Sequence, residues 1–152
     1  MTKDDLVGSW RLVDWTVSIG DRSRRPWGGK ATGLLTYTAD GRMWAALMAA
    51  DREHMPTRTL SEAPAGMRAA AASGFVTYAG SFSLDGDDVI HHVEVSLLPN
   101  YVGNDERRHV EWIDTKSGFD LALTTPPAET LSGRLVVEKL HWTRIRPGEH
   151  FA

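Results

Sequence analysis

TGLLTYTADGRMWAALM, residues 32–48, is the stretch of sequence that decides the fold. It contains two β-prone runs, residues 32–38 and 42–48, on either side of Ala39-Asp40-Gly41. Aspartate followed by glycine between apolar runs is a strong hairpin signal, because the tight turn needs a positive φ that these residues tolerate. The stretch therefore predicts two antiparallel strands joined by a short turn.

The same succession of short β-prone runs and turns continues in both directions along the chain. A second hairpin is predicted around Asp85-Gly86-Asp87-Asp88, and residues 22–30 are expected to form a loop. Eight runs are expected to be strands: residues 8–18, 32–38, 42–48, 74–84, 89–98, 106–113, 119–124 and 135–145. Many short strands separated by turns are typical of a sandwich or a barrel. We expect an all-β protein in which residues 1–152 form a single domain.

One segment interrupts this pattern. Residues 60–73 read LSEAPAGMRAAAAS, in which alanine favours a helix and the following Gly74 is a common helix stop. Because Pro64 fits the start of a helix better than its interior, the helix is expected over residues 64–73. We interpret a single short helix among so many strands as a lid or plug of the barrel, with a packed connector as the alternative.

Composition excludes several classes of protein and of site. The formal net charge is −3, and a mildly acidic chain gives no electrostatic reason to bind nucleic acid. The absence of cysteine excludes disulfides and cysteine-based metal sites and, with an N-terminus unlike a signal peptide, indicates a cytoplasmic protein. No run approaches the ~20 apolar residues of a membrane helix. No phosphate-binding loop or metal-binding motif is present, so we expect neither a cofactor nor a metal.

The first and last predicted strands carry matching signals. Gly8-Ser9-Trp10 opens the first strand, and Trp142-Thr143-Arg144 ends the last. These residues resemble those of lipocalin and related calycin barrels, in which a Gly-x-Trp lies at the closed end and an arginine of the last strand packs across the indole. The resemblance implies that Trp10, Trp142 and Arg144 close the barrel, with the guanidinium group of Arg144 stacked on Trp10.

Longer stretches resemble a family of small bacterial and fungal lipocalin-like domains. They are GSWRLVDW at residues 8–15, GLLTYTADGRM at 33–43, YAGSF at 78–82 and HHVEVSLLPNYVG at 91–103, followed by Arg107-Arg108. Because these stretches span nearly the whole chain in order, the resemblance implies an antiparallel barrel of about eight strands. Members of this family resemble ligand carriers, and related small barrels act as cofactor-free cyclases or isomerases.

Alternation along each strand predicts which side chains face the barrel interior. On the run 89–98 it places Val95 and Leu97 inside together with His91, whereas Tyr101 in the following loop is interpreted as a turn residue. The residues expected to line a ligand cavity are Tyr37, Met43, Tyr78, Phe82, His91, Val93, Arg108 and Trp112. Apolar walls with a few orienting polar groups are typical of a small-molecule pocket.

Two polar residues on these apolar faces each admit two interpretations. His91 either contacts a ligand or is a core histidine bonded to a tyrosine or a carbonyl group, and Arg108 either contacts a ligand or belongs to an ion pair at the closed end of the barrel. Since packing alone would favour apolar residues at both places, we expect their substitution to weaken ligand binding more than folding.

Three functions are consistent with the sequence. The leading hypothesis is that the barrel binds a small, largely apolar molecule, either lipid-like or of the kind made in secondary metabolism. The second is a cofactor-free cyclase or isomerase of a polyketide- or terpenoid-like substrate, with His91 as the acid or base and Tyr78 and Arg108 polarising a carbonyl. The third is a partner-binding module that uses the barrel exterior, and a homodimer is left open.

Overall fold

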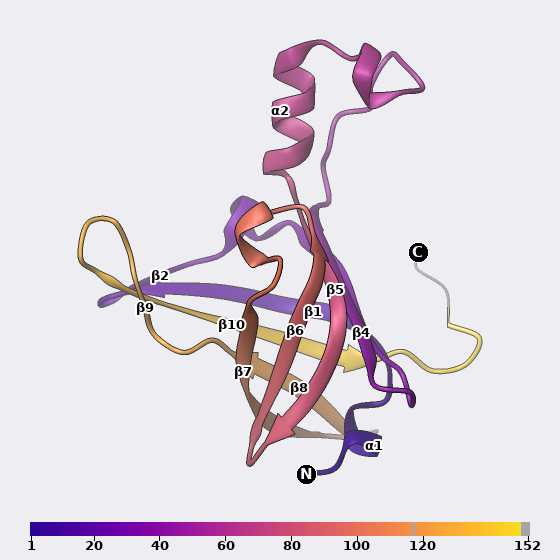
Figure 1. Cartoon of the computed structure of the whole chain (residues 1–152), viewed down its shortest axis with the longest axis vertical. Helices are drawn as coiled ribbons and strands as arrows, with labels where there is room; N and C mark the ends of the chain where they lie inside the picture. The colour runs from indigo at the N-terminus through magenta and orange to yellow at the C-terminus, as the bar shows by residue number, and fades with distance from the viewer. Residues whose placement is uncertain (117, 150–152) are drawn as a thin grey trace.

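The computed structural model describes residues 1–116 and 118–149, and its central feature is one antiparallel sheet closed into a barrel (Figure 1). In this described part the sheet has ten strands in the order β2-β1-β3-β4-β5-β6-β7-β8-β10-β9. An additional pairing of β1 with β10 joins the two sides of the sheet. The eight-stranded antiparallel barrel expected from the sequence is confirmed.

Each of the eight wall strands overlaps one of the predicted runs. They are β1 (Gly8–Ile19), β3 (Ala31–Tyr37), β4 (Arg42–Ala49), β5 (Phe75–Asp85), β6 (Asp88–Ser96), β7 (Asp105–Thr115), β8 (Gly118–Thr124) and β10 (Leu135–Arg144). Two short strands, β2 (Arg22–Arg24) and β9 (Ala128–Glu129), extend the sheet at its ends. The predicted loop at residues 22–30 therefore contains a short strand, followed by the 3-10 turn η1 (Pro26–Gly29).

The closed end of the barrel is built around Trp10. Its side chain is fully buried, and its indole Nε1 donates to the carbonyl oxygen of Leu6 at 2.9 Å, in the short helix α1 (Lys3–Leu6). The guanidinium carbon of Arg144 lies 4.2 Å from the centroid of the Trp10 ring. A Cβ atom at Gly8 would lie 2.6 Å from Nη1 of Arg144, so the glycine leaves room for the guanidinium group. The predicted stacking of Arg144 on Trp10 is confirmed.

A bulge in β6 reverses the predicted faces at its end. Ala79 pairs with Val95 but the next residue, Gly80, pairs with Val93, so Glu94 is an extra residue in the strand. A Cβ atom at Gly80 would lie 1.8 Å from the carbonyl oxygen of His92, so only glycine permits this approach. Because the bulge shifts the alternation by one residue, Val95 is 62% exposed. The prediction that Val95 faces inward is wrong. The same prediction for Leu97 is also wrong, because Leu97 is exposed.

A second bulge changes the inward face of β1. The register with β10 shifts between Leu12 and Asp14, which leaves Val13 as the extra residue, 53% exposed. Beyond the bulge Trp15 packs against the core, and Asp14 makes an ion pair with Arg25. Alternation from Trp10 onwards therefore holds only for the first part of the strand.

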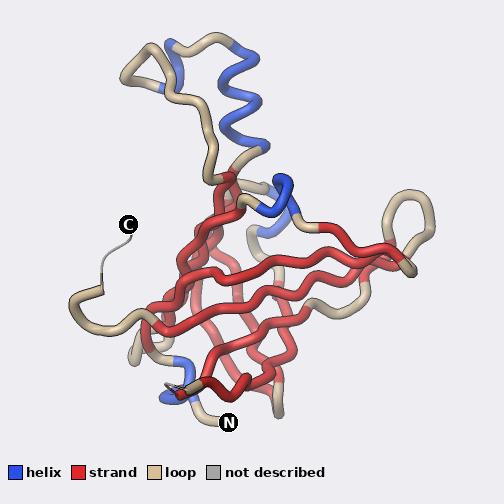
Figure 2. Tube along the Cα trace, turned by 180° about the vertical axis from the view of Figure 1, so that it is seen from behind, coloured by secondary structure: helices blue, strands red, loops and turns tan. Residues whose placement is uncertain are grey.

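The predicted helix is present as α2 (Ala65–Ser73), preceded by Pro64 and ended by Gly74. Figures 1 and 2 show it on an arm that projects from the barrel on the side opposite α1. None of its described residues is buried, and its contacts with the rest of the chain include hydrogen bonds from Trp27 to Ser73 and from Arg52 to Ala71. The helix does not plug the barrel, because none of its described residues is buried, and its role as a lid stays a prediction. Within the described residues, no helix is long and apolar enough to cross a membrane.

Candidate ligand-binding site

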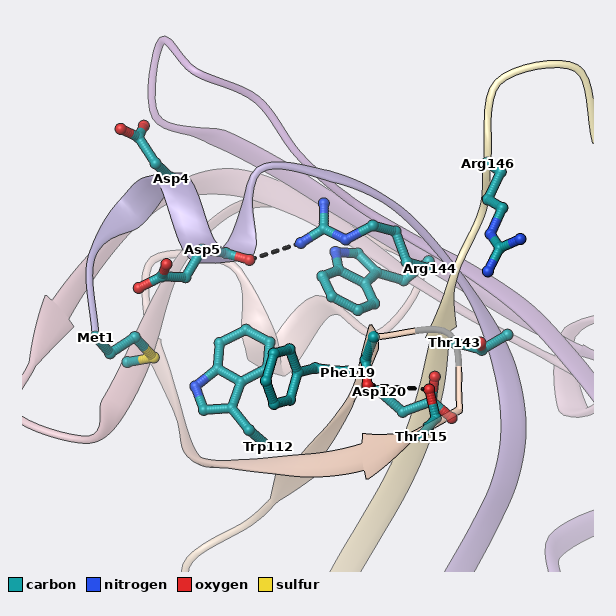
Figure 3. Close-up of a pocket in the computed structure, with 12 residues that line it drawn as sticks. Met1, Asp4, Asp5, Trp112, Thr115, Phe119, Asp120, Thr143, Arg144 and Arg146 are labelled. Atoms are coloured by element: carbon teal, nitrogen blue, oxygen red, sulfur yellow. Dashed lines mark hydrogen bonds between the residues drawn. The ribbon is translucent and has the colours of Figure 1, made fainter.

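A groove of about 790 Å³ lies at the closed end of the barrel (Figure 3). Its walls include Trp112, which is 37% exposed and lies 6.2 Å from Trp10 between ring centroids, and Phe119, which is 61% exposed. The structure therefore places Trp112 away from His91, although the sequence predicted that both line one cavity. Alternation predicts the face of a strand but not the height of a residue along the barrel axis, and this explains the correction.

A second groove of about 940 Å³ runs between the projecting arm and the barrel. It is bordered by Met48 and Phe75 of the barrel, by Met67 of α2 and by Leu97. Most of its walls are exposed side chains.

The third hollow lies inside the barrel, toward the end opposite α1. It is a cavity of about 50 Å³, smaller than the ~300–1,000 Å³ of pockets that enclose drug-sized ligands. Its apolar walls are Trp15, Leu35, Ala45, Leu47, Val76, Leu123, Leu140 and Trp142. Its polar lining consists of Tyr78, Tyr101, His91, Arg108, Thr125 and Glu138. Unlike the two grooves, this cavity contains two polar or charged side chains that are themselves buried, His91 and Arg108.

The predicted site residues divide into three groups. Tyr78, His91 and Arg108 come together at this cavity. Trp112 lies at the closed end, as described above. The other predicted lining residues are buried in the hydrophobic core and do not border the cavity: Tyr37, Met43, Phe82 and Val93.

Three aromatic residues of the cavity were missed or given another role. Trp142, predicted to close the barrel, is 2% exposed and lines the cavity. Tyr101, interpreted as a turn residue, also lines it, with its ring centroid 5.9 Å from that of Tyr78. Trp15 faces the cavity because of the bulge in β1. The large aromatic side chain of Trp15 favours a place in the barrel interior, but the sequence does not reveal the bulge that turns it inward.

His91 lies between two tyrosine hydroxyl groups. Its Nε2 atom is 2.7 Å from the hydroxyl of Tyr37, and its Nδ1 atom is 3.0 Å from the hydroxyl of Tyr78. Burial lowers the pKa of His91 well below its usual value, and the positive charge of Arg108 lowers it further. The imidazole is therefore neutral near pH 7, with one ring nitrogen as donor and the other as acceptor.

The hydrogen bonds select one tautomer of His91. Tyr37 is almost completely buried, and among the described residues its hydroxyl bonds to His91. If Nε2 carried the proton, the Tyr37 hydroxyl would accept it and its own proton would lack an acceptor, at a cost of about 1–3 kcal/mol. We therefore assign the proton to Nδ1, which donates to the oxygen of Tyr78, while Tyr37 donates to Nε2. The hydroxyl proton of Tyr78 remains available to another acceptor.

Arg108 forms an ion pair, but beside the cavity and not at the closed end of the barrel, where the sequence placed the alternative ion pair. Its Nη1 atom donates to the carboxylate of Glu106 at 3.1 Å and to the carbonyl oxygen of Arg107 at 2.8 Å. Its side chain also borders the cavity. Burial lowers the pKa of Arg108, but Tyr78 and Glu106 together raise it above the usual value, so the group stays charged. Burial also raises the pKa of Tyr78, which keeps its proton near neutral pH.

The residues do not form a metal centre. In the part of the chain that the structure describes, no group of three or more histidine, aspartate or glutamate side chains is placed to hold a metal ion. The two adjacent histidines, His91 and His92, point to opposite faces of β6, since His92 bonds to Ser83 and Asp105.

Two comparisons with known proteins bear on this site. A search of curated proteins finds no match. The family model described as a lipocalin-like domain matches residues 7–145, which include all the wall strands and every residue of the cavity. A lipocalin-like barrel is suited in general to binding small molecules. The chain belongs to the lipocalin-like domain family.

Proposed function

We propose that this protein binds a small, largely apolar molecule in the interior cavity. The ligand would enter from the end of the barrel opposite α1, which we call the open end. The observation that carries the proposal is the buried cluster of His91, Tyr78 and Arg108 beside an apolar cavity. Burying a charged guanidinium group and an imidazole is costly, and apolar side chains could fill the same space. A ligand that uses these groups gives a reason for their position.

The size of the cavity limits how the ligand is held. About 50 Å³ accommodates one end of a molecule rather than the whole of it. We therefore propose that the polar end of the ligand occupies the cavity beside Tyr78 and Arg108. The apolar remainder lies at the mouth, against the half-buried side chains of Trp15, Val76 and Leu140. The absence of cysteine is consistent with a cytoplasmic setting.

A cofactor-free cyclase or isomerase is the second candidate function. In its favour, Tyr78 and Arg108 lie close together beside the cavity and could polarise a carbonyl group. A general base works best when its pKa lies near the working pH, whereas the pKa of His91 is well below its usual value. Binding is therefore the function that the geometry supports better.

The test fills the mouth of the cavity and compares the result with a matched surface change. Leu140→Trp adds bulk at a half-buried position that lines the cavity. Leu135→Trp makes the same change on the same strand, at a position that is 57% exposed. Titration with 2-octanone and octanoate, followed by calorimetry, should show binding to the parent and to Leu135→Trp, and at least tenfold weaker binding to Leu140→Trp. Equal binding by all three proteins, or no binding to the parent, would contradict the proposal.

A further inference from the structure

Trp142 has a buried hydrogen-bond donor without an acceptor. Its Nε1 atom has no partner in the part of the chain that the structure describes, although the side chain is only 2% exposed. Trp10 and Trp15 behave differently, because their indole nitrogens donate to the Leu6 carbonyl oxygen and to Glu138, each at 2.9 Å. An indole N–H is a donor only, so what Trp142 lacks is an acceptor atom. Since Trp142 lines the cavity, a bound ligand could supply that atom.

Tyr78 offers a second donor to the same cavity. Its oxygen already accepts a hydrogen bond from Nδ1 of His91 in the tautomer assigned above, and the positive charge of Arg108 opposes the rise that burial causes in the pKa of Tyr78. The hydroxyl proton of Tyr78 is therefore directed to a further acceptor. The two tyrosines and His91 thus form a chain of hydrogen bonds that begins at the buried Tyr37 and ends in a donor beside the cavity.

Arg108 is the third donor group, and its charge is partly balanced. Its Nη1 atom is bonded to Glu106 and to the backbone of Arg107, which occupies one end of the guanidinium group. Because Glu106 offsets the positive charge, a neutral carbonyl oxygen suits this position as well as a carboxylate. Two acceptor atoms at the cavity wall are engaged, since Oε2 of Glu138 accepts from Trp15 and Oγ1 of Thr125 accepts from the backbone N–H of Glu138.

We propose that the ligand of this barrel presents an acceptor oxygen, as a carbonyl or a carboxylate, to the N–H of Trp142, the O–H of Tyr78 and the guanidinium group of Arg108. This inference rests on the proposed function of the cavity and adds the chemical class of the ligand. A ligand whose polar end is only a donor, such as an alkylammonium ion, would leave the N–H of Trp142 unpaired and would place a positive charge beside Arg108.

The test uses three probes with the same apolar chain: octanoate, 2-octanone and octylamine. Their dissociation constants are measured by calorimetry at pH 7.5 for the parent, for Trp142→Phe and for Tyr78→Phe. We expect the parent to bind octanoate and 2-octanone at least tenfold more tightly than octylamine. Each substitution should reduce that preference at least threefold, because it removes one donor and retains an aromatic ring.

The preference is the ratio of two dissociation constants measured on the same protein. A general loss of stability in a variant weakens the binding of all probes alike and therefore leaves this ratio unchanged. If one variant does not fold, the other still measures the loss of a donor. Binding of octylamine as tight as that of octanoate, or an unchanged preference in both variants, overturns this inference and leaves the proposed binding function intact. Failure of all three probes to bind the parent overturns the proposed function itself.

Discussion

The closed end of the barrel and its interior cavity each combine a buried tryptophan with an arginine, yet they differ in how their hydrogen-bond donors are used. At the closed end the Trp10 indole bonds to the carbonyl of Leu6, and Arg144 donates to the carbonyl oxygens of Val7 at 2.6 Å and Asp5 at 2.7 Å. In the interior cavity, the N–H of Trp142, two residues before Arg144 on β10, has no acceptor among the described residues. The same residue types therefore complete the fold at the closed end and leave an unused donor in the cavity.

The largest effect is expected at the closed end. Trp10→Ala removes a fully buried indole together with its hydrogen bond and its contact with Arg144, and should lower the free energy of unfolding by ~3–5 kcal/mol. Trp112→Ala, at the neighbouring half-exposed ring, should cost clearly less. Urea unfolding measures both variants. A Trp10→Ala protein with the same midpoint as the parent would show that closure does not depend on this residue.

His91→Phe should cost more stability than the sequence alone suggested. The substitution leaves the hydroxyl groups of Tyr37 and Tyr78 without their shared partner, and each unpaired buried group costs about 1–3 kcal/mol. We expect a total loss of roughly 2–4 kcal/mol in urea unfolding. The double variant with Tyr37→Phe should recover part of this loss, because it removes one of the unpaired hydroxyls. No recovery would mean that the hydrogen bond between Tyr37 and His91 contributes little.

Arg108→Met should affect ligand affinity more than stability, in contrast to His91→Phe. It removes a donor from the cavity but also removes a buried charge, whose desolvation opposes folding. We expect at least a tenfold loss of affinity for octanoate, which corresponds to about 1.4 kcal/mol, with a smaller change in stability. Arg107→Met is the control, because Arg107 is paired with Asp85 and Asp88 on the outer face. Equal loss of affinity in both variants would contradict a specific role of Arg108.

The smallest effect concerns pH. Because the pKa of folded His91 lies well below its usual value, the unfolded chain takes up a proton below about pH 6.5 that the folded chain does not. This residue therefore lowers the free energy of unfolding as pH falls, with a slope on the order of 1 kcal/mol per pH unit, and has no such effect above that pH. The stability difference between the parent and His91→Phe should narrow from pH 7.5 to pH 5.5 in urea titrations. A constant difference would indicate that His91 titrates alike in both states.

Local patterns predicted the barrel well because hairpins and alternation are local properties of the sequence. The turn at Asp40-Gly41 and the stacking of Arg144 on Trp10 are both as expected. The site was predicted less completely. The bulges at Val13 and Glu94 depend on pairing between distant strands, so the sequence did not reveal that Trp15 faces the cavity or that Val95 faces solvent.

The most direct test of the account follows the tryptophan indole N–H signals in a ¹H–¹⁵N NMR spectrum while octanoate is added. The signals of Trp10 and Trp142 are assigned by Trp10→Phe and Trp142→Phe. A ligand held in the cavity gives the Trp142 N–H its missing acceptor and leaves the bond from Trp10 to Leu6 unchanged. The account predicts a downfield shift of the Trp142 proton that saturates with octanoate, while the Trp10 signal stays in place. Saturable movement of the Trp10 signal with a stationary Trp142 signal would place the ligand at the closed end and contradict the account.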